Sequence, residues 1–192
     1  MPEDAGRIWG VHFLRVGAFP PAAARELVVR VSRRIALPCR VVATPFEGEL
    51  PLLDGRTQVN ADPLLETLET QTERGNLLVG LLALDIGSPL FTFFFGRARL
   101  HGHVAIVSAA RLRPEFYGLP PDPELTAQRI EREALHEIGH LGGLHHCDAY
   151  DCIMYFASNV HAIDNRGSSF CPDCAKKVAA GLVPRRHMGN PR

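Results

Sequence analysis

The sequence predicts a single mixed α/β (α+β) domain built around a twisted sheet. Short apolar runs that suit strands alternate along the chain with longer segments whose apolar residues recur at helical spacing. Two Asp-Pro pairs, at Asp62 and Asp122, mark helix starts, because aspartate caps a helix and proline is tolerated in its first turn. The length of 192 residues suits one compact domain with a substantial core.

The first part of the chain predicts a strand–helix–strand unit. Residues 8–16 are mainly apolar and suit a strand, and residues 40–43 suit a second one. Between them, Pro20 and Pro21 open a helix. One face of this helix carries an apolar stripe that we expect to be buried: Ala24, Leu27, Val28, Val31 and Ile35.

The middle of the chain predicts one helix followed by three strands. After a turn at Asp54-Gly55, a helix starts with Asp62 as its cap and runs to about Glu73. We expect strands at residues 77–84, 91–100 and 103–109, with a turn near Gly102 between the last two.

The last long helix is predicted to begin at Asp122-Pro123 and to end at Gly142-Gly143. The segment that follows has little periodicity, so we expect little regular structure there before a short helix after Cys171.

This helix carries the strongest chemical signal of the chain, the pattern His136-Glu137-x-x-His140. Histidines four positions apart project from one helix face and can bind a single zinc ion. The neighbouring Glu137 would stand beside the metal, where its carboxylate can take a proton from bound water. The alternative is a helix that carries surface histidines by chance.

A glycine and a histidine at fixed offsets extend the pattern. Gly143 lets the chain leave the helix, and His146 follows three residues later as a third ligand. Three protein nitrogens leave one position open for water, as in catalytic zinc sites. The complete pattern HExxHxxGxxH is the one given for metzincins, and its spacing selects His146 over the adjacent His145.

Cysteines form a second group. Cys171 and Cys174 make a CxxC turn, and Cys147 and Cys152 can supply a second pair. Four thiolates would close a tetrahedral shell around a structural zinc. The alternative is two disulfides; we favour zinc, because the N-terminus shows no secretory signal and cytosolic cysteines at such spacing more often bind metal. Cys39 is expected to be a buried free thiol.

Together these motifs resemble the archaemetzincin family, whose marks are HExxHxxGxxHC, CxM and CxxC. They stand here as residues 136–147, 152–154 and 171–174, and residues 111–118 also resemble a family segment. The resemblance implies a metzincin-type zincin fold with an active-site helix. It also implies two Zn²⁺ ions per chain, one catalytic and one structural.

Met154 gains a role only through this resemblance, which implies that it is the Met-turn methionine beneath the three histidines. Its spacing alone would equally suit an ordinary core residue. Two departures from the family pattern are noted. The interval from Met154 to Cys171 holds 16 residues, one fewer than expected, and Tyr155 stands where a smaller polar residue is expected.

In metzincins an antiparallel edge strand forms the upper rim of the cleft and pairs with extended substrate. The segment Phe91–Leu100 is the candidate, with Gly96 allowing close approach. Arg97 and Arg99 share one face and could meet a substrate carboxylate. We favour the alternative that they are solvated charges that protect an exposed edge.

Composition argues against some partners. Lys plus Arg and Asp plus Glu both total 21, so the basic excess typical of nucleic-acid binding is absent. No apolar run approaches the ~20 residues that cross a bilayer. We therefore expect a cytoplasmic monomer. Within the single domain 1–192, a sub-domain of about residues 1–142 would precede a small zinc-stapled lobe of about 143–192, with the cleft between them.

The predicted function is a zinc-dependent metallopeptidase with Glu137 as general base and a peptide or protein substrate. Endopeptidase and aminopeptidase action both remain open. A tyrosine or histidine could assist, the candidates being Tyr117, Tyr150 and Tyr155. The alternatives are a zinc-stabilised peptide-binding or regulatory module with little turnover, and a hydrolase of another amide. Retention of Glu137 favours an enzyme, because a binding module needs no base there.

Overall fold

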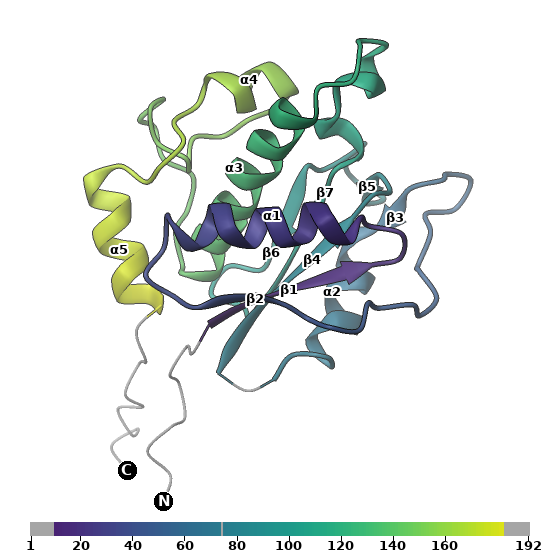
Figure 1. Ribbon diagram of the computed structural model, residues 1–192, viewed down its shortest axis with the longest axis horizontal. Coiled ribbons are helices and arrows are strands. Elements are labelled where there is room, and N and C mark those ends of the chain that lie inside the picture. The colour runs from purple at the N-terminus through teal and green to yellow at the C-terminus, as the bar shows by residue number, and fades with distance from the viewer. Residues whose placement is uncertain (1–9, 74, 183–192) are drawn as a thin grey trace, which may run out of the picture.

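The computed structural model describes residues 10–73 and 75–182. In this part of the chain a five-stranded sheet has the order β2-β1-β4-β7-β6, and only β6 is antiparallel to its neighbour (Figure 1). The predicted mixed sheet with an antiparallel edge strand is therefore confirmed. Its strands are β1 (Gly10–Val16), β2 (Cys39–Val41), β4 (Asn76–Leu82), β6 (Gly96–Ala98) and β7 (Val104–Ser108).

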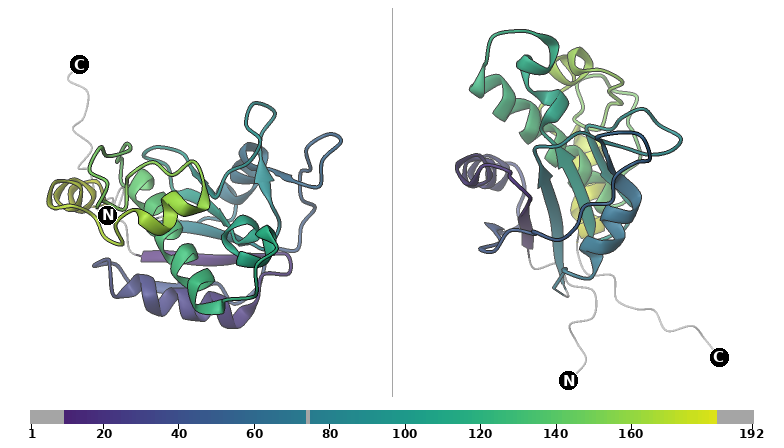
Figure 2. Two further views of the ribbon diagram at one scale, coloured as in Figure 1. Left: turned by 90° about the horizontal axis from the view of Figure 1, so that it is seen from above. Right: turned by 90° about the vertical axis from the view of Figure 1, so that its right-hand side faces the viewer.

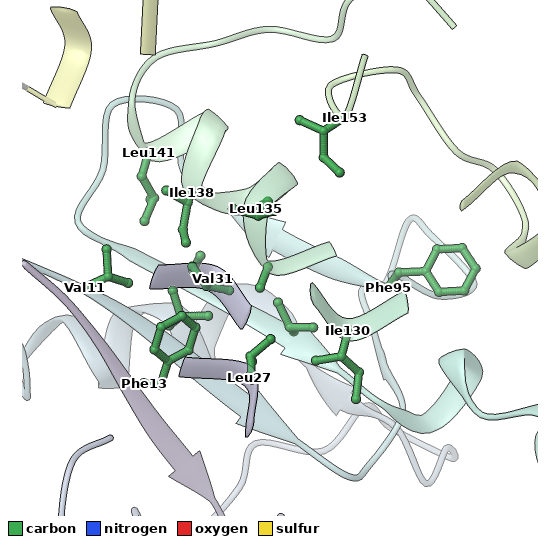
Figure 3. Close-up of a cluster of buried hydrophobic side chains, with 14 of the residues drawn as sticks. Val11, Phe13, Leu27, Val31, Phe95, Ile130, Leu135, Ile138, Leu141 and Ile153 are labelled. Atoms are coloured by element: carbon green, nitrogen blue, oxygen red, sulfur yellow. The ribbon is translucent and has the colours of Figure 1, made fainter. Parts of the chain in front are cut away.

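Helices cover both faces of this sheet. Helices α1 (Pro21–Ser32) and α3 (Pro123–Leu141) pack on one face and α2 (Ala61–Glu69) on the other, as Figure 2 shows for α1 and α2. Side chains alternate along β1 because successive residues of a strand point to opposite faces. Val11 and Phe13 join the cluster with α1 and α3, whereas Leu14 joins the cluster with α2 (Figure 3 shows the first cluster).

The central strands agree with the prediction because burial on both faces requires continuous apolar runs. All seven residues of β4 are buried, and so are all five of β7. Strand β1 begins at Gly10 among the described residues, and residues 8 and 9 of the predicted strand lie outside them. The second predicted strand, residues 40–43, is displaced by about one residue and shorter than expected.

The strand predicted at Phe91–Leu100 is wrong in length. Only Gly96–Ala98 pairs with β7, opposite Ala105–Val107. The aromatic residues before it pack on one another in a loop, with Phe91 against Phe94 and Phe93 against Phe95. The aromatic residues are therefore consecutive because they pack on one another in a loop. From the sequence alone, such an aromatic run looks the same as a long strand.

Helix α2 begins and ends earlier than predicted. Its cap is Asn60, and Asp62 lies in the first turn, where a carboxylate is favoured by the positive end of the helix dipole. Pro63 lies in the first turn as well, where its missing N–H is not needed for a helical bond. The helix ends at Glu69, four residues before the predicted end.

Several short elements were not predicted. Strands β3 (Val59–Asn60) and β5 (Ile86–Gly87) form a small parallel pair, two 3₁₀ turns span Ala110–Leu112 and Pro114–Tyr117, and α4 (Val160–Asn165) lies in the C-terminal segment. Six residues are too few for a detectable apolar stripe. Helix α4 depends instead on its cap, since the Asn159 side chain accepts from the N–H of Ala162.

Helix α3 matches its prediction at both ends and positions the candidate site. The Asp122 carboxylate accepts from the N–H of Leu125. The helix ends at Leu141, and Gly143 takes φ +87°, a conformation that favours glycine. Helix α5 (Pro172–Leu182) confirms the short helix expected after Cys171. In the part of the chain that the structure describes, no helix has the length and apolar character needed to cross a membrane.

Candidate metal centres

The C-terminal half of α3 brings His136 and His140 together. The carbonyl of Ile153 lies 2.9 Å from Nδ1 of His136, and the carbonyl of Leu144 lies 2.7 Å from Nδ1 of His140. Because a carbonyl oxygen only accepts, each Nδ1 carries the proton and donates it. Each Nε2 is then left with a free lone pair for a metal.

The spacing of these two nitrogens suits zinc. Nε2 of His136 and Nε2 of His140 lie 3.1 Å apart. Tetrahedral coordination with Zn–N bonds of 2.0–2.1 Å would place two ligands about 3.3 Å apart. Two facing lone pairs repel each other unless a cation lies between them, so this arrangement fits a bound metal ion.

His146 completes the group. The turn at Gly143 brings it back, so that the ligand atoms of His136, His140 and His146 all lie within 4.8 Å of one another. The three rings become more accessible in that order, from buried to exposed. The ring of Phe156 lies 5.0 Å from that of His146, between ring centroids. The open side of the group is therefore the side of His146.

Burial also keeps these histidines neutral. Loss of solvation is the main cause that lowers the pKa of all three, and it lowers that of His140 to about 4. The Arg166 guanidinium lowers the pKa of His136 further. Neutral imidazole is the form that binds a metal, so the environment favours coordination.

Glu137 lies beside the histidines with one oxygen free. Its side chain is buried, and no described group bonds its Oε2. Gly96 of β6 lies directly against the carboxylate. Burial is the main cause that raises the pKa of Glu137 well above its usual value, and the neighbouring Glu133 carboxylate raises it further. This carboxylate can therefore accept a proton from a nearby water and return it.

Behind the histidines lies a buried ion pair. Nη2 of Arg166 donates to Oε2 of Glu133 at 2.6 Å, and Nη1 lies 3.2 Å from Nδ1 of His136. Arg166 immediately follows α4, so the pair joins the C-terminal segment to α3.

Met154 packs beneath the helix between the two histidine turns. It is fully buried, and its Sδ would lie 2.4 Å from a Cβ placed on Gly139. The glycine therefore makes room for the thioether. Both this contact and the bond from His136 to the carbonyl of Ile153 bring the segment around Met154 against α3.

The four expected cysteines also converge. The Sγ atoms of Cys147, Cys152, Cys171 and Cys174 lie within 4.8 Å of one another. Those of Cys147 and Cys171 are 4.0 Å apart, far from the ~2.05 Å of a disulfide and near the ~3.8 Å expected between thiolates on one zinc. All five cysteines are free thiols, so the disulfide alternative is not supported.

The surroundings of the cysteine group lower the pKa of one thiol and raise the pKa of two others. A hydrogen bond from the backbone N–H of Cys174 lowers the pKa of Cys171, whereas burial raises the pKa of Cys152 and of Cys174. Two buried thiols would thus remain protonated by themselves. A cation would stabilise their thiolates, which fits a metal site. Cys39, the fifth cysteine, is partly buried, and burial raises its pKa to about 11.

The other candidates are placed as follows. Arg97 pairs with Asp62, and Arg99 with two carboxylates of α2. This agrees with the interpretation of both as surface charges. The side chains of Tyr117, Tyr150 and Tyr155 are all exposed, and the hydroxyl of Tyr117 donates to the carbonyl of Arg111.

Comparisons with known proteins agree with this geometry. The profile described as peptidase family M54 matches residues 25–180. The chain belongs to this family. It is 40% identical over 123 residues to the archaemetzincin of Methanocaldococcus jannaschii, covering 64% of this chain and 67% of that protein. It is 38% identical over 127 residues to that of Methanopyrus kandleri, covering 66% and 69%.

Two solved structures match more of the chain. A zinc-dependent peptidase from Methanocorpusculum labreanum superposes with a TM-score of 0.81 at 28% identity, over 88% of this chain and all of that one. The archaemetzincin of Methanopyrus kandleri superposes with a TM-score of 0.76 at 30% identity, over 94% and 98%. The resemblance, the fold class and the expectation of a zinc metalloprotease are therefore confirmed at the level of the family.

Two residues of this site escaped the sequence analysis. Glu133 precedes Glu137 by one helical turn, so their shared face was readable from the spacing. Arg166 gives no such signal, because it lies 33 residues beyond Glu133 in a segment without periodicity. Only the tertiary fold brings it to α3.

Proposed function

We propose that this protein hydrolyses peptide bonds at a zinc ion held by Nε2 of His136, of His140 and a ring nitrogen of His146. Zinc bound there would lower the pKa of its water toward ~7 and polarise the scissile carbonyl. The observation that carries the proposal is the convergence of three neutral imidazoles beside a carboxylate with a free oxygen.

Glu137 is the proposed general base. Its free Oε2 takes a proton from the attacking water and then delivers one to the leaving amine. A raised pKa suits this task, because the carboxylate must hold the proton between the two steps. Gly96 and the rest of β6 would lie along the substrate, since the outer edge of this strand has no neighbour in the described sheet.

The cysteine group is proposed to hold a second, structural zinc. Four thiolates leave no open position for water or substrate. The metal would cross-link the C-terminal segment and so stabilise it, because α4 and α5 alone offer little apolar surface for a core. We further propose a monomeric cytoplasmic enzyme, and light scattering of the purified protein tests the first part of this statement.

The test is mass spectrometry of a diverse peptide library incubated with zinc-loaded protein, beside the variants Glu137→Ala and Glu137→Gln. We expect cleavage by the parent only, with unchanged zinc content in both variants. The positions of the new ends distinguish internal cleavage from N-terminal trimming. Substantial cleavage by pure Glu137→Ala would refute the role of the base, and no cleavage by the fully loaded parent would favour the binding module.

A further inference from the structure

The buried guanidinium of Arg166 bonds one of two neighbouring buried carboxylates of α3, that of Glu133. Glu133 and Glu137 are four residues apart on α3 and both are buried. Glu133 accepts from Arg166 at 2.6 Å, with side-chain exposures of 7% for Glu133 and 1% for Arg166. Oε2 of Glu137 has no described partner.

This inequality has a physical consequence. A buried guanidinium requires a compensating anion, because its desolvation is costly. Glu137 is the neighbouring buried carboxylate, one helical turn from Glu133, and Nη1 of Arg166 lies 3.2 Å from Nδ1 of the adjacent His136. Without Glu133, the charge of Arg166 would be compensated most readily by Glu137 itself.

We propose that Glu133 is a positioning residue that holds Arg166 away from Glu137 and so keeps the carboxylate of the base free for water. This inference rests on the role proposed for Glu137. In this proposal Glu133 affects catalysis through Arg166. A purely structural ion pair would only hold the C-terminal segment against α3.

The two interpretations differ in the effect of removing both charges. If the ion pair only ties two segments together, E133Q/R166M can regain stability, because it removes the uncompensated guanidinium, but the kcat of its folded, zinc-loaded form equals that of E133Q. If Glu133 keeps Arg166 from the base, E133Q frees Arg166 to bind Glu137, and the additional R166M change removes the competitor. The double variant is then more active than the single one.

Steady-state kinetics of the zinc-loaded variants tests whether E133Q/R166M is more active than E133Q. We expect E133Q to lower kcat by roughly 10–100-fold, less than the roughly 10²–10⁴-fold attributed to a general base because Glu137 is hindered and not removed, with unchanged KM and zinc content. E133Q/R166M should regain at least about tenfold of that loss. Activity of the double variant equal to or below that of E133Q overturns the proposal.

A second readout needs no turnover. Thermal unfolding is measured for E137Q in the parent and in the E133Q background. Oε2 of Glu137 has no described partner in the parent, whereas the Glu137 carboxylate would pair with Arg166 in E133Q, so E137Q should lower Tm only in the second background. Equal shifts in both backgrounds overturn the proposal, even if the parent proves to have no peptidase activity.

E133Q leaves Arg166 without its carboxylate partner, which could prevent the variant from folding. If that variant is not obtained folded, E133D replaces it, because aspartate keeps the charge and shortens its reach. Its kcat is then expected between that of the parent and one-tenth of it, again with zinc retained. A kcat equal to that of the parent would contradict the proposal.

Discussion

Gly96 of the edge strand lies against the carboxylate of Glu137. A Cβ atom at position 96 would stand 2.6 Å from Oε1 and 2.7 Å from Cγ of Glu137. Real Cβ contacts are not this short, so any side chain at Gly96 would displace the carboxylate or the strand. We expected Gly96 to make room for substrate. The space that its missing side chain leaves is instead occupied by the carboxylate of Glu137, the proposed base.

Gly96→Ala should lower kcat about 10–100-fold while zinc content stays unchanged, because the added methyl group pushes Glu137 out of place. Steady-state kinetics and metal analysis check this result. Ala98→Gly is the matched control, since it changes one methyl group two residues along the same short strand. Loss of activity in the control alone, or normal kcat in Gly96→Ala, would contradict the steric explanation.

Gly139→Ala should destabilise the protein by about 1–3 kcal/mol, because the new methyl group would overlap Sδ of Met154. Glycine-to-alanine changes within helices are otherwise stabilising by about 1 kcal/mol. Denaturant unfolding of the zinc-loaded protein measures the change. The double variant Gly139→Ala/Met154→Ala should cost less than the sum of the two single changes, and strict additivity would argue against the contact.

Cys171→Ser should reduce the zinc content by one ion per chain and lower Tm, because the cysteine group loses a thiolate. Cys39→Ser is the control, since Cys39 lies outside the group and should leave the metal content unchanged. Metal analysis and thermal unfolding check both variants. A normal zinc content in Cys171→Ser would refute the four-thiolate site.

Metal-free protein should lose stability as the pH falls from about 6.5 to about 4. The folded-state pKa of His140 is lowered to about 4, so in this range the unfolded chain binds more protons than the folded one. The contribution of His140 to stability is therefore fully present above pH 6.5, and roughly 3 kcal/mol of it is lost as the pH falls through about 4. Urea unfolding at several pH values measures the slope.

His140→Gln serves as the reference for this experiment, because it removes one titrating group and leaves the carboxylates unchanged. Its stability should depend less steeply on pH than that of the parent over the same range. Identical slopes would show that burial of His140 does not contribute.

Sequence alone predicted the parts of the fold where one local signal dominates. Strand β4 has no polar side chain after Asn76, and α3 has a cap at Asp122 and a glycine exit at Gly143. The fixed spacing of the histidines and cysteines likewise pointed to the two groups that the fold brings together. Each of these signals lies within a short stretch of chain.

The remaining features depend on tertiary contacts. The length of β6 is set by its pairing with β7, and the aromatic residues before it pack on one another instead of continuing the strand. The bond between Glu133 and Arg166 joins residues 33 positions apart. The contact between Gly96 and Glu137 depends on where the edge strand crosses α3. No local pattern encodes such distances.

The graded exposure of the three histidines has a consequence for metal exchange. His136 is buried, His140 is half-buried and His146 is exposed, three residues after the turn at Gly143. An ion leaving the site would first lose His146 and remain briefly held by the two helix histidines, which are anchored through their Nδ1 atoms. A chelator should therefore compete with recapture by His146 for the ion in the two-histidine state, so that the rate of extraction from this site levels off at high chelator concentration.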